Sequence, residues 1–291
     1  MPRGVPKNGV RMTAKRLAMA TMHQTQIAKP LIPVIEEPRE VVRQRITERF
    51  EMLSYLTDAA IDGEVKGCIF SGPPGLGKSF TVEKKLERYD PEGDRTRIVK
   101  GFTRATGIYQ LLHEMQYPGS VLVFDDCDSA FMDEASINLI KAATDTTDRR
   151  IISWRAETKM VGEDGEPLPT RFEFNGSVIF ITNLDFEAAI ASGSRLAPHM
   201  EALASRAFYL DLMMKTRNDY LVRIEQVVSE GMLLSRGISD RTQNEIMQFV
   251  EKNRDRLSEL SLRMVVKLAI LAKTQPQRWK TFAENTMMRR S

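Results

Sequence analysis

The sequence contains little cysteine and no long apolar run, and both absences narrow what the protein can be. Among 291 residues there are only two cysteines, Cys68 and Cys127, and both fall in or beside predicted buried strands. This pair offers neither a disulfide framework nor the ligand spacing of a metal site. No apolar stretch approaches the roughly 20 residues that span a membrane. The N-terminus lacks the apolar segment of a signal peptide, so we expect a soluble, cytoplasmic protein.

Acidic residues are missing from the N-terminal segment. The first 30 residues hold six basic side chains and no acidic one, whereas the whole chain has a net charge of only +3. With its prolines and glycines, this composition predicts a flexible basic tail over residues 1–33. Attraction to nucleic-acid phosphates is one interpretation of the tail, and a solvated leader that helps solubility is the other.

The apolar pattern predicts an α/β domain followed by an all-helical one. A helix with one apolar face is expected from Pro38 to about Gly63, and apolar runs at 66–72, 97–101, 120–126, 177–183 and 207–212 predict strands. Because helical segments separate most of these strands, we expect a parallel sheet sandwiched between helices over residues 34–212. After residue 213 the pattern is only helical, which predicts a small α-helical lid domain over residues 213–291.

A phosphate-binding loop is predicted where the first strand ends. The stretch "GPPGLGKS" fits the pattern G-x-x-x-x-G-K-[ST] and lies between a predicted strand and a predicted helix. Glycines let the backbone amides turn toward a phosphate, Lys78 reaches the β- and γ-phosphates, and the Ser79 hydroxyl binds Mg²⁺. The alternative is a glycine-rich turn without a ligand. The expected nucleotide-binding residues are Gly72, Pro73, Pro74, Gly75, Leu76, Gly77, Lys78, Ser79 and Phe80.

Two aspartates follow the apolar run "VLVF". We expect Asp125 to hold Mg²⁺ beside Ser79, and Asp126 to orient and activate the attacking water. Simple surface charge is the alternative for such a pair. Asp128 and Glu134 are alternative bases, although both are better explained as residues that cap or cover the next helix.

These motifs together resemble the AAA+ ATPases. The segment "VIFITN" is similar to the family's sensor 1 strand and ends at Asn183, and "LASRAFYLDL" is similar to the segment that carries the arginine finger, here Arg206. "SLRMVVKLA" resembles the sensor 2 helix, with Arg263 directed at the phosphates. The resemblance extends from about residue 35 to 285, and it departs from the family's usual Asp-Glu pair at Asp126, which is one methylene shorter.

The resemblance implies an ATPase that uses ATP and Mg²⁺ and forms a homo-oligomeric ring, expected to be a hexamer. Arg206 would enter a neighbouring subunit's site and make hydrolysis depend on assembly. The alternatives are a surface salt bridge for Arg206, with Arg195 as the substitute finger, a solvated helix residue for Arg263, and a turn cap for Asn183.

The sequence indicates less clearly which macromolecule the ATPase acts on. Residues 149–176 predict a β-hairpin with an acidic tip at Glu163, Asp164 and Glu166, which serves either DNA contact or packing and protein contact. Phe102 follows the second strand of the domain, where protein-remodelling members of the family carry an aromatic pore loop, although a core position is its commonest role. The candidate substrate contacts are Lys100, Phe102, Arg104 and Lys159.

Three functions remain open at this point. The first is an oligomeric ATPase that works on DNA as a helicase, helicase loader or remodelling factor, which the basic tail and the Lys100–Arg104 cluster favour. The second is an ATPase that remodels or loads a protein partner, which Phe102 and the acidic hairpin favour. The third is a nucleotide-dependent assembly scaffold, for which slow hydrolysis at Asp126 suffices.

Overall fold

The computed structural model describes residues 37–155, 160–162 and 165–289. Residues 38–291 form one compact unit. The basic tail, Lys159 and the acidic pair Glu163 and Asp164 lie outside the described residues.

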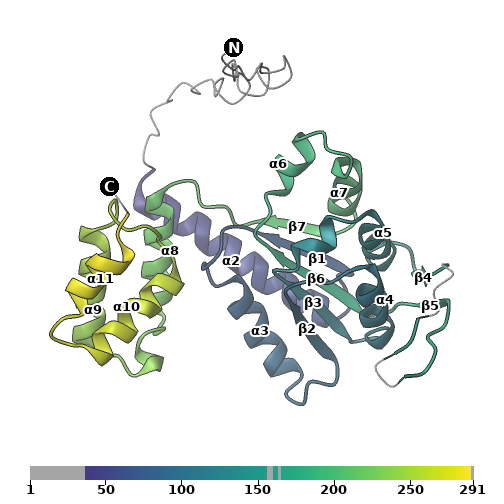
Figure 1. Cartoon of the computed structure of the whole chain (residues 1–291), viewed down its shortest axis with the longest axis horizontal. Coiled ribbons are helices and arrows are strands. Elements are labelled where there is room, and N and C mark those ends of the chain that lie inside the picture. The colour runs from purple at the N-terminus through teal and green to yellow at the C-terminus, as the bar shows by residue number, and fades with distance from the viewer. Residues whose placement is uncertain (1–36, 156–159, 163–164, 290–291) are drawn as a thin grey trace, which may run out of the picture. The chain divides into compact units, whose positions relative to one another are not determined.

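A five-stranded sheet organises the first part of this unit. Its strand order is β2-β3-β6-β1-β7, and every neighbouring pair is parallel (Figure 1). Because all the strands run in the same direction, their carboxyl ends meet at one edge of the sheet, and the predicted motifs lie at this edge. The predicted strands are confirmed to within a residue or two: β1 (Gly67–Ser71), β2 (Thr96–Lys100), β3 (Val121–Asp125), β6 (Ser177–Thr182) and β7 (Phe208–Asp211).

Helices cover both faces of the sheet, as the predicted α/β architecture requires. In β3, Leu122 and Phe124 join the core on one face, whereas Val121 and Val123 join the core on the other. The first core lies under α4 (Ala105–Glu114), α5 (Glu134–Ala143) and α7 (Ala197–Ala204), and the second under α2 (Arg39–Ile61) and α3 (Lys78–Tyr89). The strand is apolar along its whole length because alternate side chains are buried on opposite faces. A 3₁₀ turn (Asp128–Phe131) and α6 (Phe186–Ala191) complete this region.

The predicted hairpin is present and packs on α4. Its strands β4 (Ile151–Ser153) and β5 (Arg171–Glu173) pair antiparallel. Tyr109 on α4 lies between Trp154 and Phe172, with ring centroids 5.7 and 5.3 Å away, and its hydroxyl donates to the Pro169 carbonyl. The base of the hairpin is therefore held on the sheet domain by aromatic packing.

The described part of the predicted helical region contains four α-helices around a core of its own. They are α8 (Arg217–Ser229), α9 (Asp240–Lys252), α10 (Leu262–Thr274) and α11 (Trp279–Met287), with a 3₁₀ turn at Leu234–Arg236. Thr216, Ser239 and Ser261 cap the first three helices with their hydroxyls. We call this region the lid. Among the described helices, none is both long and apolar enough to cross a membrane.

Candidate active site

The phosphate-binding loop connects β1 to α3 at the carboxyl edge of the sheet. Gly75 and Gly77 have φ angles of +76° and +94°, in the left-handed region that costs other residues about 1–2 kcal/mol. These angles explain why glycine stands at the motif position Gly77 and at Gly75 inside the loop. The helix that begins at Lys78 directs the positive end of its dipole at the loop.

Lys78 is buried and bonds to its own loop. Its ammonium donates to the carbonyls of Gly72 and Pro73 and, over 3.1 Å, to Oδ1 of Asn183. Burial lowers the pKa of Lys78 to about 8, and the nearby carboxylates of Asp126 and Asp125 partly offset this effect. The cation is therefore placed among neutral carbonyl oxygens that a phosphate oxygen can replace.

Ser79 and Asp125 form the metal side of the site. The Ser79 hydroxyl donates to Oδ1 of Asp125 over 2.8 Å, so the two predicted Mg²⁺ contacts already lie together. In the described part of the chain, no cluster of three metal-ligating side chains exists. This donor set fits Mg²⁺ rather than a protein-caged metal, because Mg²⁺ is usually held by one or two protein oxygens, water and substrate phosphates.

Asp126 has an unusual backbone. Its φ of +54° is the only positive value among the described non-glycine residues. Aspartate tolerates this left-handed conformation better than most residues because its short side chain bonds locally. The conformation gives a physical reason for aspartate where the family usually has glutamate. Burial, and then the charge of Asp125, raise the pKa of the Asp126 carboxyl.

Asn183 joins the two sides of the site. Its amide nitrogen donates to Oδ1 of Asp126 over 2.8 Å, while its oxygen accepts from Lys78. A residue that only caps a turn would not make these two contacts, so they disfavour the turn-cap alternative for Asn183.

The two alternative bases have other partners. Asp128 accepts a hydrogen bond from the Thr182 hydroxyl, and Glu134 lies 3.9 Å from His199.

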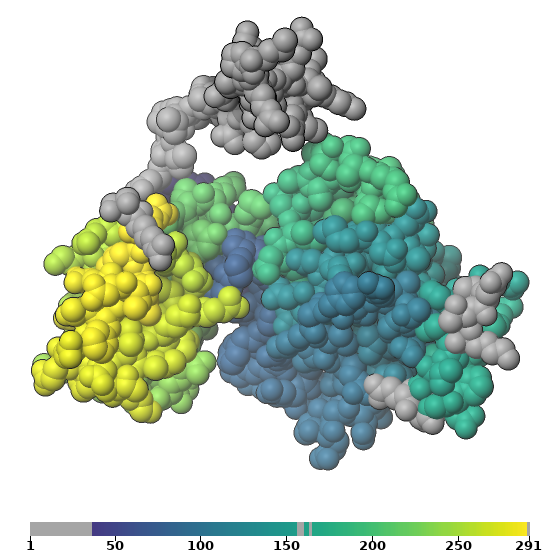
Figure 2. All heavy atoms as spheres, in the orientation of Figure 1, coloured from purple at the N-terminus to yellow at the C-terminus, as the bar shows by residue number. Residues whose placement is uncertain are grey.

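A cleft of about 680 Å³ opens between the loop, α3 and the lid. Figure 2 shows the surface hollowed between the blue sheet-domain segment and the yellow-green lid helices. Asp126, Asn183 and Arg263 all line this cleft together with the loop. Its further cations come from α3 and the lid and comprise Lys84, Lys85, Arg88, Arg223 and Arg236. The cleft is therefore suited to a polyanion.

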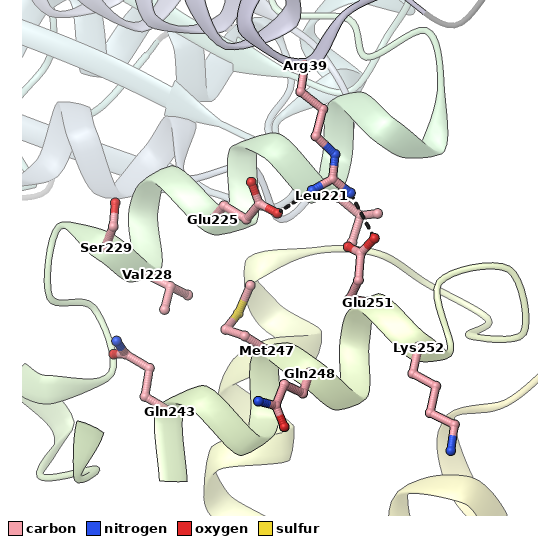
Figure 3. A pocket seen from close by; sticks show the side chains of 10 residues that line it. All are labelled: Arg39, Leu221, Glu225, Val228, Ser229, Gln243, Met247, Gln248, Glu251 and Lys252. Atoms are coloured by element: carbon pink, nitrogen blue, oxygen red, sulfur yellow. Dashed lines mark hydrogen bonds and ion pairs between the residues drawn. The ribbon is translucent and has the colours of Figure 1, made fainter. Parts of the chain in front are cut away.

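The lid is attached to both the loop and α2. The Leu262 amide at the start of α10 donates to the Gly75 carbonyl over 2.8 Å, and Arg223 on α8 donates to the Leu76 carbonyl over 3.2 Å. Away from the cleft, Arg39 on α2 forms ion pairs with Glu225 and Glu251 (Figure 3). The lid is thus fixed to the sheet domain at several points.

Arg206 lies apart from this cleft. It follows α7, donates to the Ala202 carbonyl over 2.7 Å and lies 3.9 Å from Asp145, with a side chain that is 36% exposed. Arg195 is exposed in the preceding loop. The finger role of Arg206 stays a prediction, because it concerns a second subunit.

The predicted substrate contacts differ in where they lie: Phe102 and Arg104 form an exposed pair, whereas Lys100 contacts acidic residues near the loop. Phe102 is 72% exposed, which makes the core alternative wrong, and the Arg104 guanidinium lies over its ring at 5.4 Å. Lys100 instead pairs with Glu83 and lies 3.4 Å from Asp125. Lys100 is therefore beside the metal-side acid, and Lys159 is outside the described residues.

The lid residues that hold the loop were not predicted from the sequence. Arg223 and Leu262 contact residues that are more than 140 positions away in the chain. One signal in the sequence could have indicated Arg223, which lies inside the apolar segment "YLVRI". A charged residue on a buried helix face requires a polar partner.

The chain has a relative among known proteins. The chain is 34% identical over 251 residues to an uncharacterized 36.7 kDa protein of Enterobacteria phage T4 from the nrdC–mobD intergenic region, covering 86% of the chain and 76% of the relative. No protein-family model matches.

Solved structures give weaker similarities. They include the RuvB Holliday junction branch migration motor of Thermotoga maritima, with a TM-score of 0.43 and 17% identity over 81% of the chain and 62% of that structure. NtrX of Brucella abortus in complex with ADP has a TM-score of 0.43 and 15% identity over 90% of the chain and 57% of that structure. The chain thus spans less than two thirds of either structure.

Proposed function

We propose that this chain, which belongs to the family of the phage T4 protein, is a P-loop ATPase of the AAA+ type that hydrolyses ATP with Mg²⁺. One observation carries the proposal, namely the convergence of Lys78, Asp126, Asn183 and Arg263 on a single cleft. The strand order brings Lys78, Asp126 and Asn183 together at one edge of the sheet, and α10 of the lid contributes Arg263.

The side chains have distinct tasks in this reaction. The loop amides and Lys78 bind the β- and γ-phosphates, with the Lys78 ammonium exchanging its loop carbonyls for phosphate oxygens. Ser79 and Asp125 would hold Mg²⁺. When bound, Mg²⁺ neutralises phosphate charge and orients the phosphates.

Asp126 is the proposed base. It accepts a proton as the water oxygen forms a bond to the γ-phosphorus, and the bond to the bridging oxygen breaks so that ADP leaves with the electron pair. Asn183 holds the carboxylate by its 2.8 Å hydrogen bond. Arg263, from the lid, adds positive charge at the phosphates as they develop negative charge.

Assembly into a ring, with six subunits as the expected number, completes the proposal. Arg206 is outside its own cleft and partly exposed, which suits a residue that enters the site of a neighbouring subunit. An arginine supplied in this way couples hydrolysis to oligomerisation.

DNA is the proposed object of the work. The exposed Phe102 with Arg104 stacked on its ring combines an aromatic face with a cation, the pair that single strands bind. The basic N-terminal segment adds attraction for phosphates. Phe102 also favours a second candidate, the remodelling or loading of a protein partner, and a nucleotide-dependent scaffold is the third.

The test measures ATP turnover with and without single-stranded and duplex DNA. We expect stimulation by DNA that weakens at raised salt and in a chain that lacks residues 1–30. An ATP turnover rate that neither single-stranded nor duplex DNA changes would contradict the DNA proposal. A Phe102→Ala variant that keeps basal turnover but loses work on a protein would favour the second candidate.

A further inference from the structure

The lid holds two consecutive carbonyl groups of the phosphate-binding loop. The backbone amide of Leu262 donates to the Gly75 carbonyl over 2.8 Å, and Nε of Arg223 donates to the next carbonyl, that of Leu76, over 3.2 Å. The two donors come from different lid helices, α10 and α8. Both bonds therefore act on the turn that carries the two left-handed glycines.

Peptide geometry transmits these bonds to the phosphate side of the loop. In a planar trans peptide the carbonyl and the following N–H point in opposite directions. A bond that holds the Leu76 carbonyl on Arg223 therefore turns the Gly77 amide to the opposite side of that peptide, and the bond from Leu262 to the Gly75 carbonyl does the same for the Leu76 amide. These amides belong to the set that cradles phosphate in such loops.

The environment of Arg223 shows that it is a fixed group rather than a surface residue. It is 7% exposed, and its guanidinium lies 3.4 Å from the centroid of the Phe50 ring on α2. Among the described residues, no carboxylate lies within ion-pair distance of it. The Phe50 ring, the Leu76 carbonyl and the charge of Glu230, which acts from beyond ion-pair distance, compensate for burying the charge. A terminal nitrogen of Arg223 also lies close to Gly77, 3.6 Å from where a Cβ would stand.

We propose that Arg223 is a positioning residue for nucleotide binding, which holds the Leu76–Gly77 peptide in the phosphate-binding orientation and links that orientation to the lid. The inference rests on the proposed ATPase function, but names a residue that acts through the loop backbone. Only arginine suits this role, because a planar guanidinium stacks on a ring and donates in its own plane at once. By linkage, bound nucleotide must strengthen the lid contacts as much as these contacts strengthen its binding.

The experiment compares Arg223→Lys with Arg217→Lys in the full-length chain. Arg217 is a matched control because it lies on the same helix and donates to the backbone carbonyls of Arg254 and Leu257, away from the loop. ADP affinity is measured by calorimetry, and the melting temperature is recorded for each variant. We expect R223K to weaken ADP binding roughly tenfold or more, and R217K to leave ADP affinity within about twofold even where it lowers the melting temperature.

A second pair of variants separates positioning from general packing. Phe50→Tyr keeps the ring under Arg223 and should keep ADP affinity, whereas Phe50→Leu removes the ring and should weaken ADP binding. In wild type, ADP should slow hydrogen exchange at the Leu262 amide, and this protection should be smaller in R223K.

The outcomes distinguish the inference from the proposed function. If wild-type protein and R223K bind ADP with equal affinity, the proposed role of Arg223 is wrong, while the ATPase proposal is unaffected. An equal loss of affinity in R217K would also overturn it, because the effect would then be general destabilisation of the lid. A wild-type chain that binds no ADP would overturn the proposed function itself.

Discussion

The amide of Asn183 donates a 2.8 Å hydrogen bond to the carboxylate of Asp126. Because Asn183 also accepts from Lys78, the proposed base and the phosphate-binding ammonium are connected through one side chain. The position of the base is thus set by a group that also contacts the phosphate-binding lysine. This connection makes the identity of Asp126 testable.

Asp126→Asn should lower ATP turnover about 100-fold or more, because a positioned base contributes at least that much. ATP binding should survive, since the amide is the same size. Single-turnover hydrolysis and calorimetry with ATP measure the two effects. Asp133→Asn is the control, because Asp133 caps α5 away from the cleft and asparagine caps equally well. Unchanged turnover in D126N would show that another group activates the water.

ADP affinity should depend on pH through Lys78, whose pKa burial lowers to about 8. Phosphate binds the protonated form, so affinity should be constant below about pH 8. Above it, affinity should fall roughly tenfold per pH unit, since free protein must first take up a proton. Calorimetry from pH 7 to 9.5 with a metal chelator tests this, and circular dichroism checks that the chain stays folded. A constant affinity up to pH 9.5 would contradict the assignment.

Arg206→Ala should lower turnover about 1,000-fold if Arg206 is the arginine finger, while ATP binding stays intact. Mixing this variant with the equally inactive Lys78→Ala variant should restore part of the activity, because each supplies what the other lacks at a shared interface. Arg195→Ala tests the substitute finger. Normal turnover in R206A together with a loss in R195A would transfer the role to Arg195.

Gly75→Ala should be more harmful than its backbone angle alone explains. A Cβ at Gly75 would lie 2.7 Å from Ser261 Cβ, whereas Gly63, with a nearly identical φ of +77°, has open space around it. Gly63→Ala should therefore cost about 1 kcal/mol of unfolding free energy from backbone strain alone. Gly75→Ala should cost more and also weaken ADP binding. Denaturant unfolding and calorimetry measure the two quantities, and equal costs without loss of affinity would refute the lid contact.

The sequence was sufficient for the sheet and the loop because both have local signals. The central strands β1, β3 and β6 are built on apolar runs that are buried throughout, and "GPPGLGKS" requires only its own spacing. The parallel arrangement followed from the alternation of strands with helices, which leaves few ways to connect them.

Features that depend on distant contacts were not predictable. Arg223 reaches Leu76 across 147 positions, and its own helix gives no indication of which group accepts its hydrogen bond. The exposure of Phe102 depends on how the β2–α4 connection leaves the sheet, and the sequence favoured the core for a lone aromatic. The left-handed backbone of Asp126 likewise has no signature in "VFDD".

The strand order also has a consequence for how the protein is made. β1, which leads into the phosphate-binding loop, pairs with β6 and β7, whose residues lie more than 100 positions later in the chain. During synthesis from the N-terminus, β1 has no strand neighbour until β6 has left the ribosome, and the lid contacts from Arg223 and Leu262 come later still. We therefore expect fragments that end before the lid to gain no protection from ATP.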